Sequence, residues 1–374
     1  MKHHARAAVA LCATVSALGL TACASSGGGA PVSPSPSAAA AGPATAASLV
    51  QAAKSEKGLV IYGNAPTQYL QPVIDAFEHH YPGIKVTETA LGDTTTFSKY
   101  QAEAAQGART ADILMASAPA SWVQAEQNNV TANVIPSGLS NFPAWVNQGH
   151  GVYVMSPEPV VEVYNPKLLA AAQVPRTYAQ LAADTASNPA KYKLVSYPID
   201  DPLNYAAIYG LIHLLGSAQV WHDYGLMGPS TKTFSEGLAG LQQIIQGGAS
   251  IGYISSGLAQ GVVPHYKGLA SYTFMKDATP LVPRAVAVTA KASSPASAQL
   301  FLDFLYSKPG QDALCAGGFE ASMNNYQPSN GCTASLTKLQ SQVPANTTYL
   351  VPITQAVLDQ VPAITQQWNK AFHR

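Results

Sequence analysis

From about residue 55 onward, short apolar runs alternate along the chain with longer segments in which apolar residues recur every three or four positions. The short runs predict buried strands, and the longer segments predict amphipathic helices. Strands are expected at 59–62, 84–88, 111–115, 152–155, 160–164, 194–197, 251–254 and 285–288. Helices are expected at 70–81, 97–107, 202–215, 238–246, 295–305 and 352–372. Such alternation is typical of mainly parallel sheets covered by helices on both faces.

Two predicted helices differ in how they begin. Asp201-Pro202 offers an Asp N-cap followed by Pro at the first helical position, which is a strong start signal. Asp93-Thr94-Thr95-Thr96 is instead interpreted as a polar turn, with a helix that starts near Phe97.

The elements fall into two α/β groups, joined by extended segments near residues 152–160 and 281–289. Two crossings describe a hinge, because the chain leaves one lobe, builds the second and returns. The roughly 325 residues that carry these elements also exceed what one compact core usually accommodates. The predicted fold is therefore a two-lobed α/β protein in which each lobe is a helix-covered, mainly parallel sheet. The expected limits are lobe 1 at 48–155 with a return segment at 284–320, lobe 2 at 156–283, and a C-terminal helical segment at 321–374 that packs on the lobes.

The first 47 residues predict export and anchoring. A basic start is followed by an apolar stretch at 7–20, which is too short for a permanent membrane span and typical of a signal peptide, expected at 1–22. Leu20-Thr21-Ala22-Cys23 resembles the bacterial lipoprotein box, which implies that Cys23 becomes the lipidated first residue; the alternative is an ordinary signal peptide with a chance Cys. Residues 23–47 are almost wholly Ala, Ser, Gly, Pro and Thr, and predict a flexible tether. The protein is expected outside the cytoplasm, anchored to the cell membrane.

Charge and cysteine content narrow the possible functions. The formal net charge is zero, with 20 basic and 20 acidic residues and no basic cluster, so nucleic acid is not an expected partner. Cys12 lies in the signal peptide, which leaves Cys315 and Cys332 in the folded part. In an oxidising exterior such a pair predicts a disulfide. The alternative, a two-Cys metal site, has no His close to it in sequence.

Several segments together resemble the extracellular solute-binding proteins of ABC importers, in the subgroup that includes the ferric-ion-binding proteins. They are Gly58–Tyr62, Val73–Glu78, Tyr81–Val86, Ala111–Leu114, Val163–Lys167, Thr279–Val288 and Ala298–Gln311. The resemblance implies the type II periplasmic-binding-protein fold, a cleft that closes on a ligand, and a membrane permease and ATPase as partners. It also implies a binding protein rather than an enzyme, and we expect a monomer without a cofactor.

In two loops the chain departs from the iron binders that it resembles. Those proteins use adjacent tyrosines after the strand that corresponds to 251–254, and a His after the first strand. Here these places read Ser255-Ser256-Gly257-Leu258 and Gly63-Asn64-Ala65-Pro66. Phenolate oxygens suit a hard cation and are missing as a pair, so no metal site is predicted. An iron chelate, an anion and an amine stay open as ligands.

Ligand contacts are expected where strands end and helices begin, because free N–H groups and helix dipoles meet there. The candidates are Tyr62, Asn64, Thr94, Thr95, Thr96, Ser117, Tyr153, Asp201, Asn204, Tyr205, Tyr253, Ser255 and Ser256. The Thr94–Thr96 run is the best candidate for a polar or anionic head group. The alternatives are that one Thr caps a helix, that Asp201 is a cap only, and that Tyr62 packs in the core.

The leading functional hypothesis is capture of a small polar or anionic solute and its delivery to an importer. One alternative is a sensor subunit that passes the bound ligand to a signalling partner. Another is a lipid-anchored hydrolase, because Gly248-Ala249-Ser250-Ile251-Gly252 matches the G-x-S-x-G elbow of serine hydrolases. That elbow follows a strand and precedes a helix, whereas here the order is reversed.

The cysteine prediction can be tested by counting thiols. In denatured, unreduced mature protein, neither Cys315 nor Cys332 is expected to react with a thiol reagent, because both sulfurs are bonded to one another. Two thiols should appear after reduction. Two reactive thiols before reduction would contradict the pairing.

Overall fold

The computed structural model describes residues 46–373, except 236, 330 and 333. These residues belong to one compact unit. The predicted signal peptide, the lipidation of Cys23 and the tether as far as residue 45 lie outside the described residues. In the part that is described, no helix combines the length and the apolar character that a membrane span requires.

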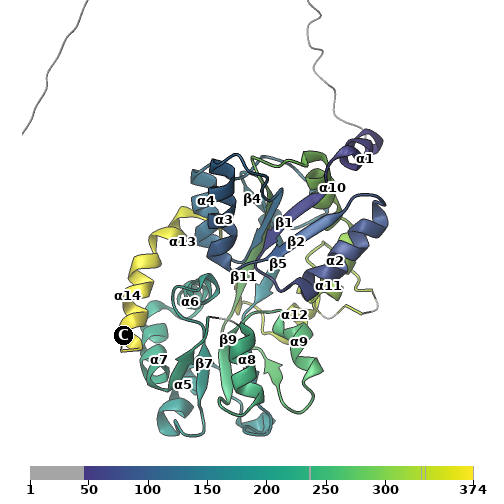
Figure 1. The fold of residues 1–374 in the computed structure, drawn as a ribbon. Helices are drawn as coiled ribbons and strands as arrows, with labels where there is room; N and C mark the ends of the chain where they lie inside the picture. The colour runs from purple at the N-terminus through teal and green to yellow at the C-terminus, as the bar shows by residue number, and fades with distance from the viewer. Residues whose placement is uncertain (1–45, 236, 330, 333, 374) are drawn as a thin grey trace, which may run out of the picture. The chain divides into compact units, whose positions relative to one another are not determined.

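The first lobe is built on a seven-stranded sheet (Figure 1). Its strand order is β2 (Val86–Ala90), β1 (Leu59–Gly63), β3 (Ile113–Ala116), β11 (Thr279–Val288), β5 (Val152–Pro159) and β4 (Asn147–Gly149), with β12 (Thr348–Leu350) paired to β11. The helices of this lobe are α1 (Ala46–Ser55), α2 (Thr67–His80), α3 (Asp93–Ala105), α4 (Pro119–Gln127), α10 (Pro295–Leu305) and α11 (Lys308–Ala316).

Alternating side chains of this sheet enter two separate cores. Ile61 packs with Phe77 of α2 and Phe301 of α10 on one face. The next residue, Tyr62, packs with Trp122 of α4 on the other face. The two-residue repeat of a strand sends neighbouring side chains to opposite faces, so helices cover both.

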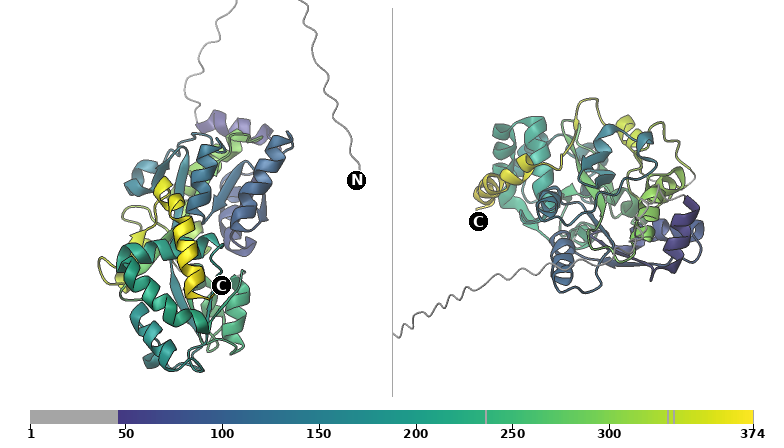
Figure 2. Two further views of the ribbon diagram at one scale, coloured as in Figure 1. Left: turned by 90° about the vertical axis from the view of Figure 1, so that its left-hand side faces the viewer. Right: turned by 90° about the horizontal axis from the view of Figure 1, so that it is seen from above.

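The second lobe is built on a five-stranded sheet. Its strand order is β10 (Ser271–Thr273), β6 (Val161–Tyr164), β9 (Ile251–Ser255), β7 (Leu194–Ser196) and β8 (Thr231–Thr233). The helices are α5 (Tyr178–Ser187), α6 (Pro202–Leu215), α7 (Ser217–Met227), α8 (Gly237–Ile245), α9 (Ala259–Val262), α12 (Leu336–Gln342) and α14 (Val361–Ala371). α13 (Gln355–Asp359) packs on both lobes, with Val357 in a core of the second and Leu358 against a core of the first. One face of the sheet packs with α5–α7 and α14, and the other with α8 and α12. Figure 2 shows α14 lying along the outside of this lobe.

Two strands carry the chain between the lobes. β5 leads into β6 through Val160 alone, and β11 brings the chain back. The two strands pair antiparallel, with Leu281 opposite Pro159 and Ala285 opposite Val154, and the register shifts between Arg284 and Ala285. These are the two extended crossings that the sequence predicted near 152–160 and 281–289.

The predicted fold class is confirmed, with one correction about strand direction. Both sheets are mixed rather than mainly parallel. In the first sheet β11 runs antiparallel to β3 and β5, and in the second β6 runs antiparallel to β9 and β10. The physical reason is that strands which carry the chain out of a lobe and back must run in opposite directions. The residue limits expected for each lobe stay predictions.

Some local expectations were wrong. Asp93–Thr96 is not a turn but the first turn of α3, because extended Gly92 precedes it and the Thr96 hydroxyl donates back to the Gly92 carbonyl at 3.1 Å. The helix α4, which begins at Pro119, was not among the predicted helices. The C-terminal segment is not only helical, because β12 joins the first sheet beside β11.

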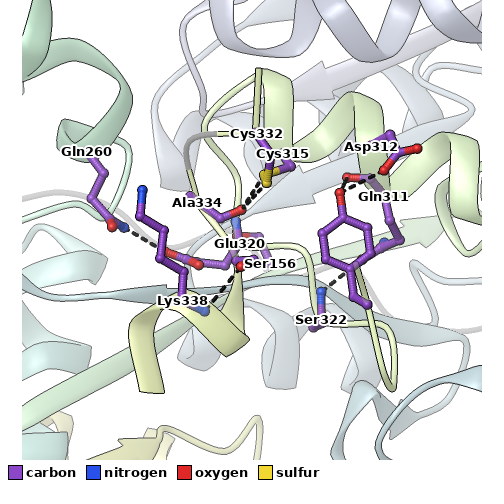
Figure 3. The surroundings of a disulfide bond; sticks show 12 residues. Ser156, Gln260, Gln311, Asp312, Cys315, Glu320, Ser322, Cys332, Ala334 and Lys338 are labelled. Atoms are coloured by element: carbon purple, nitrogen blue, oxygen red, sulfur yellow. Dashed lines mark hydrogen bonds between the residues drawn. A yellow bond between two sulfur atoms is a disulfide. The ribbon is translucent and has the colours of Figure 1, made fainter. Parts of the chain in front are cut away.

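The loop that Cys315 and Cys332 close touches both lobes (Figure 3). The two cysteines are disulfide-bonded with their Cα atoms 4.8 Å apart. Within the loop, the Glu320 N–H donates to the Ser156 hydroxyl of β5 at 2.9 Å. The Glu320 carboxylate accepts from Gln260 of α9 at 2.5 Å. The segment therefore links the two lobes a third time, beside the hinge strands.

Candidate functional site

A cavity of about 280 Å³ lies where the strands of both sheets end. Its first-lobe side comes from the loops after β1, β2 and β3, and its second-lobe side from the loops after β7, β8 and β9 and from α8. The hinge strands β5 and β11 supply the rest. The polar lining residues are Asn64, Asp93, Ser117, Glu158, Ser196, Tyr197, Asp201, Ser235, Ser255, Ser256 and Arg284, with Tyr69 beside them.

A buried ion pair joins the two hinge strands at this cavity. Arg284 Nε lies 2.5 Å from Glu158 Oε1, and Nη2 lies 3.2 Å from Oε2. The side chains are 4% and 1% exposed. Arg284 Nη1 also donates to Asn64, and the Ser256 hydroxyl donates to Glu158 Oε2 at 2.9 Å. The paired charges thereby connect the β1 loop of one lobe with the β9 loop of the other.

Asp93 occupies the first-lobe side of the cavity at the first residue of α3. Its Oδ1 accepts from the Ser117 backbone N–H at 3.2 Å and from the Asn64 side-chain amide. Burial raises the pKa of Asp93 to about 6; Arg284 and the Ser117 N–H act against this rise, and Glu158 adds to it.

Asp201 occupies the second-lobe side as the N-cap of α6. Its Oδ1 accepts from the backbone N–H groups of Leu203 at 2.9 Å and Asn204 at 3.4 Å. Burial raises the pKa of Asp201 to about 7, and repulsion from Asp93 is the next contribution. Carboxylates from opposite lobes are thus close enough to repel one another.

The remaining wall of the cavity is apolar. It consists of Leu91, Val163, Val195, Leu203, Phe234, Leu238, Leu241, Ile244, Ile254, Leu258, Ala259 and Val262, with Pro66. Most of these residues belong to the second lobe, and α8 contributes Leu238, which is 47% exposed. The site therefore combines a charged region near the hinge with an apolar region over α8 and β9.

Five of the predicted ligand residues line this cavity, and their role in binding stays a prediction. They are Asn64, Ser117, Asp201, Ser255 and Ser256. Four of them directly follow a strand or precede a helix, and Ser255 is the last residue of β9.

The other eight predicted residues lie elsewhere. The tyrosines are buried: Tyr62 donates to Glu103 at 2.8 Å, Tyr205 donates to the Val357 carbonyl, and Tyr153 and Tyr253 pack in the cores. These tyrosine side chains point away from a face of their strand or helix, and not toward the end of the element where the cavity lies.

The polar members of this group have local roles. Thr94 and Thr95 are exposed on α3, and Thr96 is buried and bonded to Gly92. The Asn204 amide donates to the carbonyls of Tyr197 at 2.8 Å and Pro198 at 3.2 Å, and so holds the loop before α6.

Three charged residues of the cavity were missed by the sequence reasoning: Asp93, Glu158 and Arg284. A signal was present for two of them. Glu158 and Arg284 are single charges in otherwise buried strands, and buried charges are normally paired.

Two alternative chemistries can be compared with the structure. The Ser250 side chain is 1% exposed, and its hydroxyl donates to the Lys193 carbonyl at 3.0 Å. α8 precedes it and β9 follows, which is the reverse of a nucleophile elbow. Among the described residues, no three His, Cys, Asp or Glu side chains are grouped so that they could hold a metal ion.

One family model matches this chain, and solved structures share its fold. The model of the bacterial extracellular solute-binding protein family matches residues 63–312. The substrate binding protein of an ABC transporter from Agrobacterium tumefaciens superposes with a TM-score of 0.76 at 20% identity, over 85% of this chain and 95% of that chain. Iron-bound HitA from Pseudomonas aeruginosa gives 0.67 at 16% identity, over 84% and 99%. A periplasmic thiamin binding protein gives 0.67 at 17% identity, over 85% and 97%. No curated protein matches by sequence.

The raised pKa values of Asp93 and Asp201 predict how stability depends on pH. A carboxyl group whose pKa is raised by folding holds its proton in the folded state while the unfolded chain has lost it, so stability falls as pH rises from about 4 to 7. Asp93→Asn and Asp201→Asn keep the accepting oxygen but cannot ionise. Between pH 5 and pH 7.5, the free energy of unfolding of each variant should rise by on the order of 1–2 kcal/mol relative to that of the unsubstituted protein.

Urea denaturation of the ligand-free protein at both pH values measures this difference. Asp75→Asn on the exposed side of α2 is the matched control and should show no such gain. If the free energy of unfolding changed equally with pH in the unsubstituted protein and in all three variants, the electrostatic description of the site would be contradicted.

Proposed function

Because the chain belongs to the bacterial extracellular solute-binding protein family, we propose that it captures a small solute in this cavity and delivers it to an ABC importer. The observation that carries the proposal is that residues from both lobes and from both hinge strands line one cavity. A ligand that contacts both lobes favours the conformation in which they are close, and so can couple binding to closure.

The size and composition of the cavity support a small molecule as the ligand. A volume of about 280 Å³ is near the lower end of the range for small-molecule sites. A largely apolar wall with a few polar groups at one end is the usual composition of such sites. The ligand does not follow from the fold, since the proteins of similar structure include one described as iron-bound and one as thiamin binding.

We also propose that the protein acts as a monomer held at the outer face of the membrane by a lipid on Cys23. The lipobox-like sequence and the tether support the anchor. A Cys315–Cys332 disulfide is consistent with an oxidising compartment outside the cytoplasm.

The binding proposal predicts that some small molecule raises the melting temperature. A ligand present at 100 times its Kd stabilises the folded state by about 2.7 kcal/mol, which corresponds to several degrees or less for a chain of this size. Differential scanning fluorimetry with a panel of cations, anions, sugars, amino acids and iron chelates measures the shift. A panel without any stabilising compound would remove the main support for the function.

A matched pair of variants locates the binding. Gly240 lies on α8 at the cavity, and Gly225 lies on α7 away from it; a Cβ at either position meets open space. Gly240→Trp should therefore occupy the cavity and abolish the thermal shift, whereas Gly225→Trp should leave it unchanged. If the ligand still raised the melting temperature of Gly240→Trp by the full amount, its binding site would lie elsewhere.

The anchor proposal predicts a change of compartment on substitution of one cysteine. Cys23→Ala should move the protein from the membrane fraction to the soluble extracytoplasmic fraction, because the acyl chain has no attachment point. Cys12→Ala, within the predicted signal peptide, is the matched control and should leave the protein membrane-bound. Immunoblots of the fractions measure this, and retention of Cys23→Ala on membranes would contradict the anchor.

A further inference from the structure

The charged side chains of the cavity are unequal in sign. In the described lining, three are acidic, Asp93, Glu158 and Asp201, and one is basic, Arg284. The sign of the charge that the site can accept therefore depends on which of these four groups are already paired.

Arg284 is already engaged by two side chains of the protein, which use three of its five N–H donors. Both oxygens of Glu158 engage Nε and Nη2, and Asn64 accepts from Nη1. Guanidinium and carboxylate neutralise one another in this two-point geometry. An anion entering the cavity would therefore meet a guanidinium whose charge Glu158 already balances.

Asp93 and Asp201 are not neutralised in the same way. In the described part of the chain, neither forms an ion pair within 4.0 Å. Each accepts only neutral N–H donors, from Asn64 and Ser117 on one side and from the start of α6 on the other. Two acidic groups from opposite lobes thus lie at the cavity without a cation of their own.

These carboxylates also occupy the N-termini of two helices at the cavity. Asp93 is the first residue of α3, and Asp201 caps α6. Each places its own negative charge where a helix dipole would otherwise attract one. An anionic ligand at either helix would therefore meet a carboxylate first.

A second observation points to a ligand at the same place. Ser117 lines the cavity and is 3% exposed, and its Oγ has no hydrogen-bond partner among the described residues. The backbone N–H of the same residue binds Asp93. A buried hydroxyl without a partner is costly, and a ligand N–H beside Asp93 would provide one.

The ionisation of the two carboxyl groups supports the same conclusion. Burial raises the pKa of Asp93 to about 6; the Glu158 carboxylate adds to this rise and Arg284 opposes it. Burial raises the pKa of Asp201 to about 7, and the carboxylates of Asp93 and Asp200 add to this rise. A bound cation would favour the ionised form of both groups and relieve their repulsion.

We propose that the solute is an organic cation whose charged group lies between Asp93 and Asp201, while its apolar body packs on the wall formed by α8 and β9. This inference rests on the proposed solute-binding function. It replaces the anionic head group that the Thr94–Thr96 run suggested, because Thr94 and Thr95 are exposed on α3 and Thr96 is bonded within it.

Two sets of probes matched in shape test the sign of the charge. One set is choline, 3,3-dimethylbutan-1-ol and 3,3-dimethylbutanoate; the other is phenethylamine, 2-phenylethanol and phenylacetate. Thermal shift and titration calorimetry at pH 7.5 should show binding by a cation and weaker or no binding by its neutral and anionic counterparts. Absence of binding by both cations, or equal binding by an anion, would overturn the inference.

The two carboxylates are tested directly with the cation that binds. Asp93→Asn and Asp201→Asn should each weaken its binding at least about tenfold, since each removes one charge from a partly buried pair. Asp75→Asn should have no effect. In the unsubstituted protein the affinity should rise between about pH 5 and pH 7.5, because binding requires ionised carboxylates. Unchanged affinity in both Asp93→Asn and Asp201→Asn would overturn the inference. So would an affinity of the unsubstituted protein that rises on acidification, which is measured without any variant.

Failure of this inference differs from failure of the proposed function. If a neutral or anionic compound binds in a manner that Gly240→Trp blocks, the cavity is a solute site but not a cation site. If no compound of the wider panel binds, the solute-binding function itself is lost.

Discussion

The Arg284–Glu158 ion pair is the interaction on which the arrangement of the two lobes depends. Each partner lies on one of the two hinge strands, and both are almost fully buried. A charge in such a place is tolerated only with a well-placed partner, and loss of either partner would leave the other uncompensated. The further bonds to Asn64 and Ser256 extend this pairing to a loop of each lobe. Both partners line the cavity. Glu158 therefore engages Arg284, which is the only cationic side chain among the described lining residues.

The position of the cavity follows from how the sheets are covered. Helices pack on both faces of each sheet, so alternate side chains of β1 or β7 enter one core or the other. Only the ends of the strands stay accessible, and there the chain places short polar loops and helix starts. The two sets of ends face the same cavity, which explains why its polar residues come from loops distant in sequence.

The disulfide-closed loop adds a third connection beside the two hinge strands. Glu320 is bonded to Ser156 of β5 and to Gln260 of α9, and burial raises its pKa to about 7. Beyond the loop, α12 places Leu339 in a core of the second lobe, while Cys315 closes the loop from α11 in the first. Motion between the lobes must therefore bend this loop as well as β5 and β11.

The sequence by itself determined the features that depend on neighbouring residues. The strand and helix alternation, the Asp201 cap of α6, the two crossings and the two-lobed fold class all follow from local periodicity and capping chemistry. It also indicated the loops that hold Asn64, Ser117, Ser255 and Ser256. Only the tertiary structure decided that Tyr62, Tyr153, Tyr205 and Tyr253 enter the cores, and that Asp93 belongs to a helix start at the cavity. It alone paired Glu158 with Arg284, 126 residues apart. The physical reason is that the direction of a side chain at the end of an element, and the partner of a buried charge, are set by packing between distant segments, which local patterns do not contain.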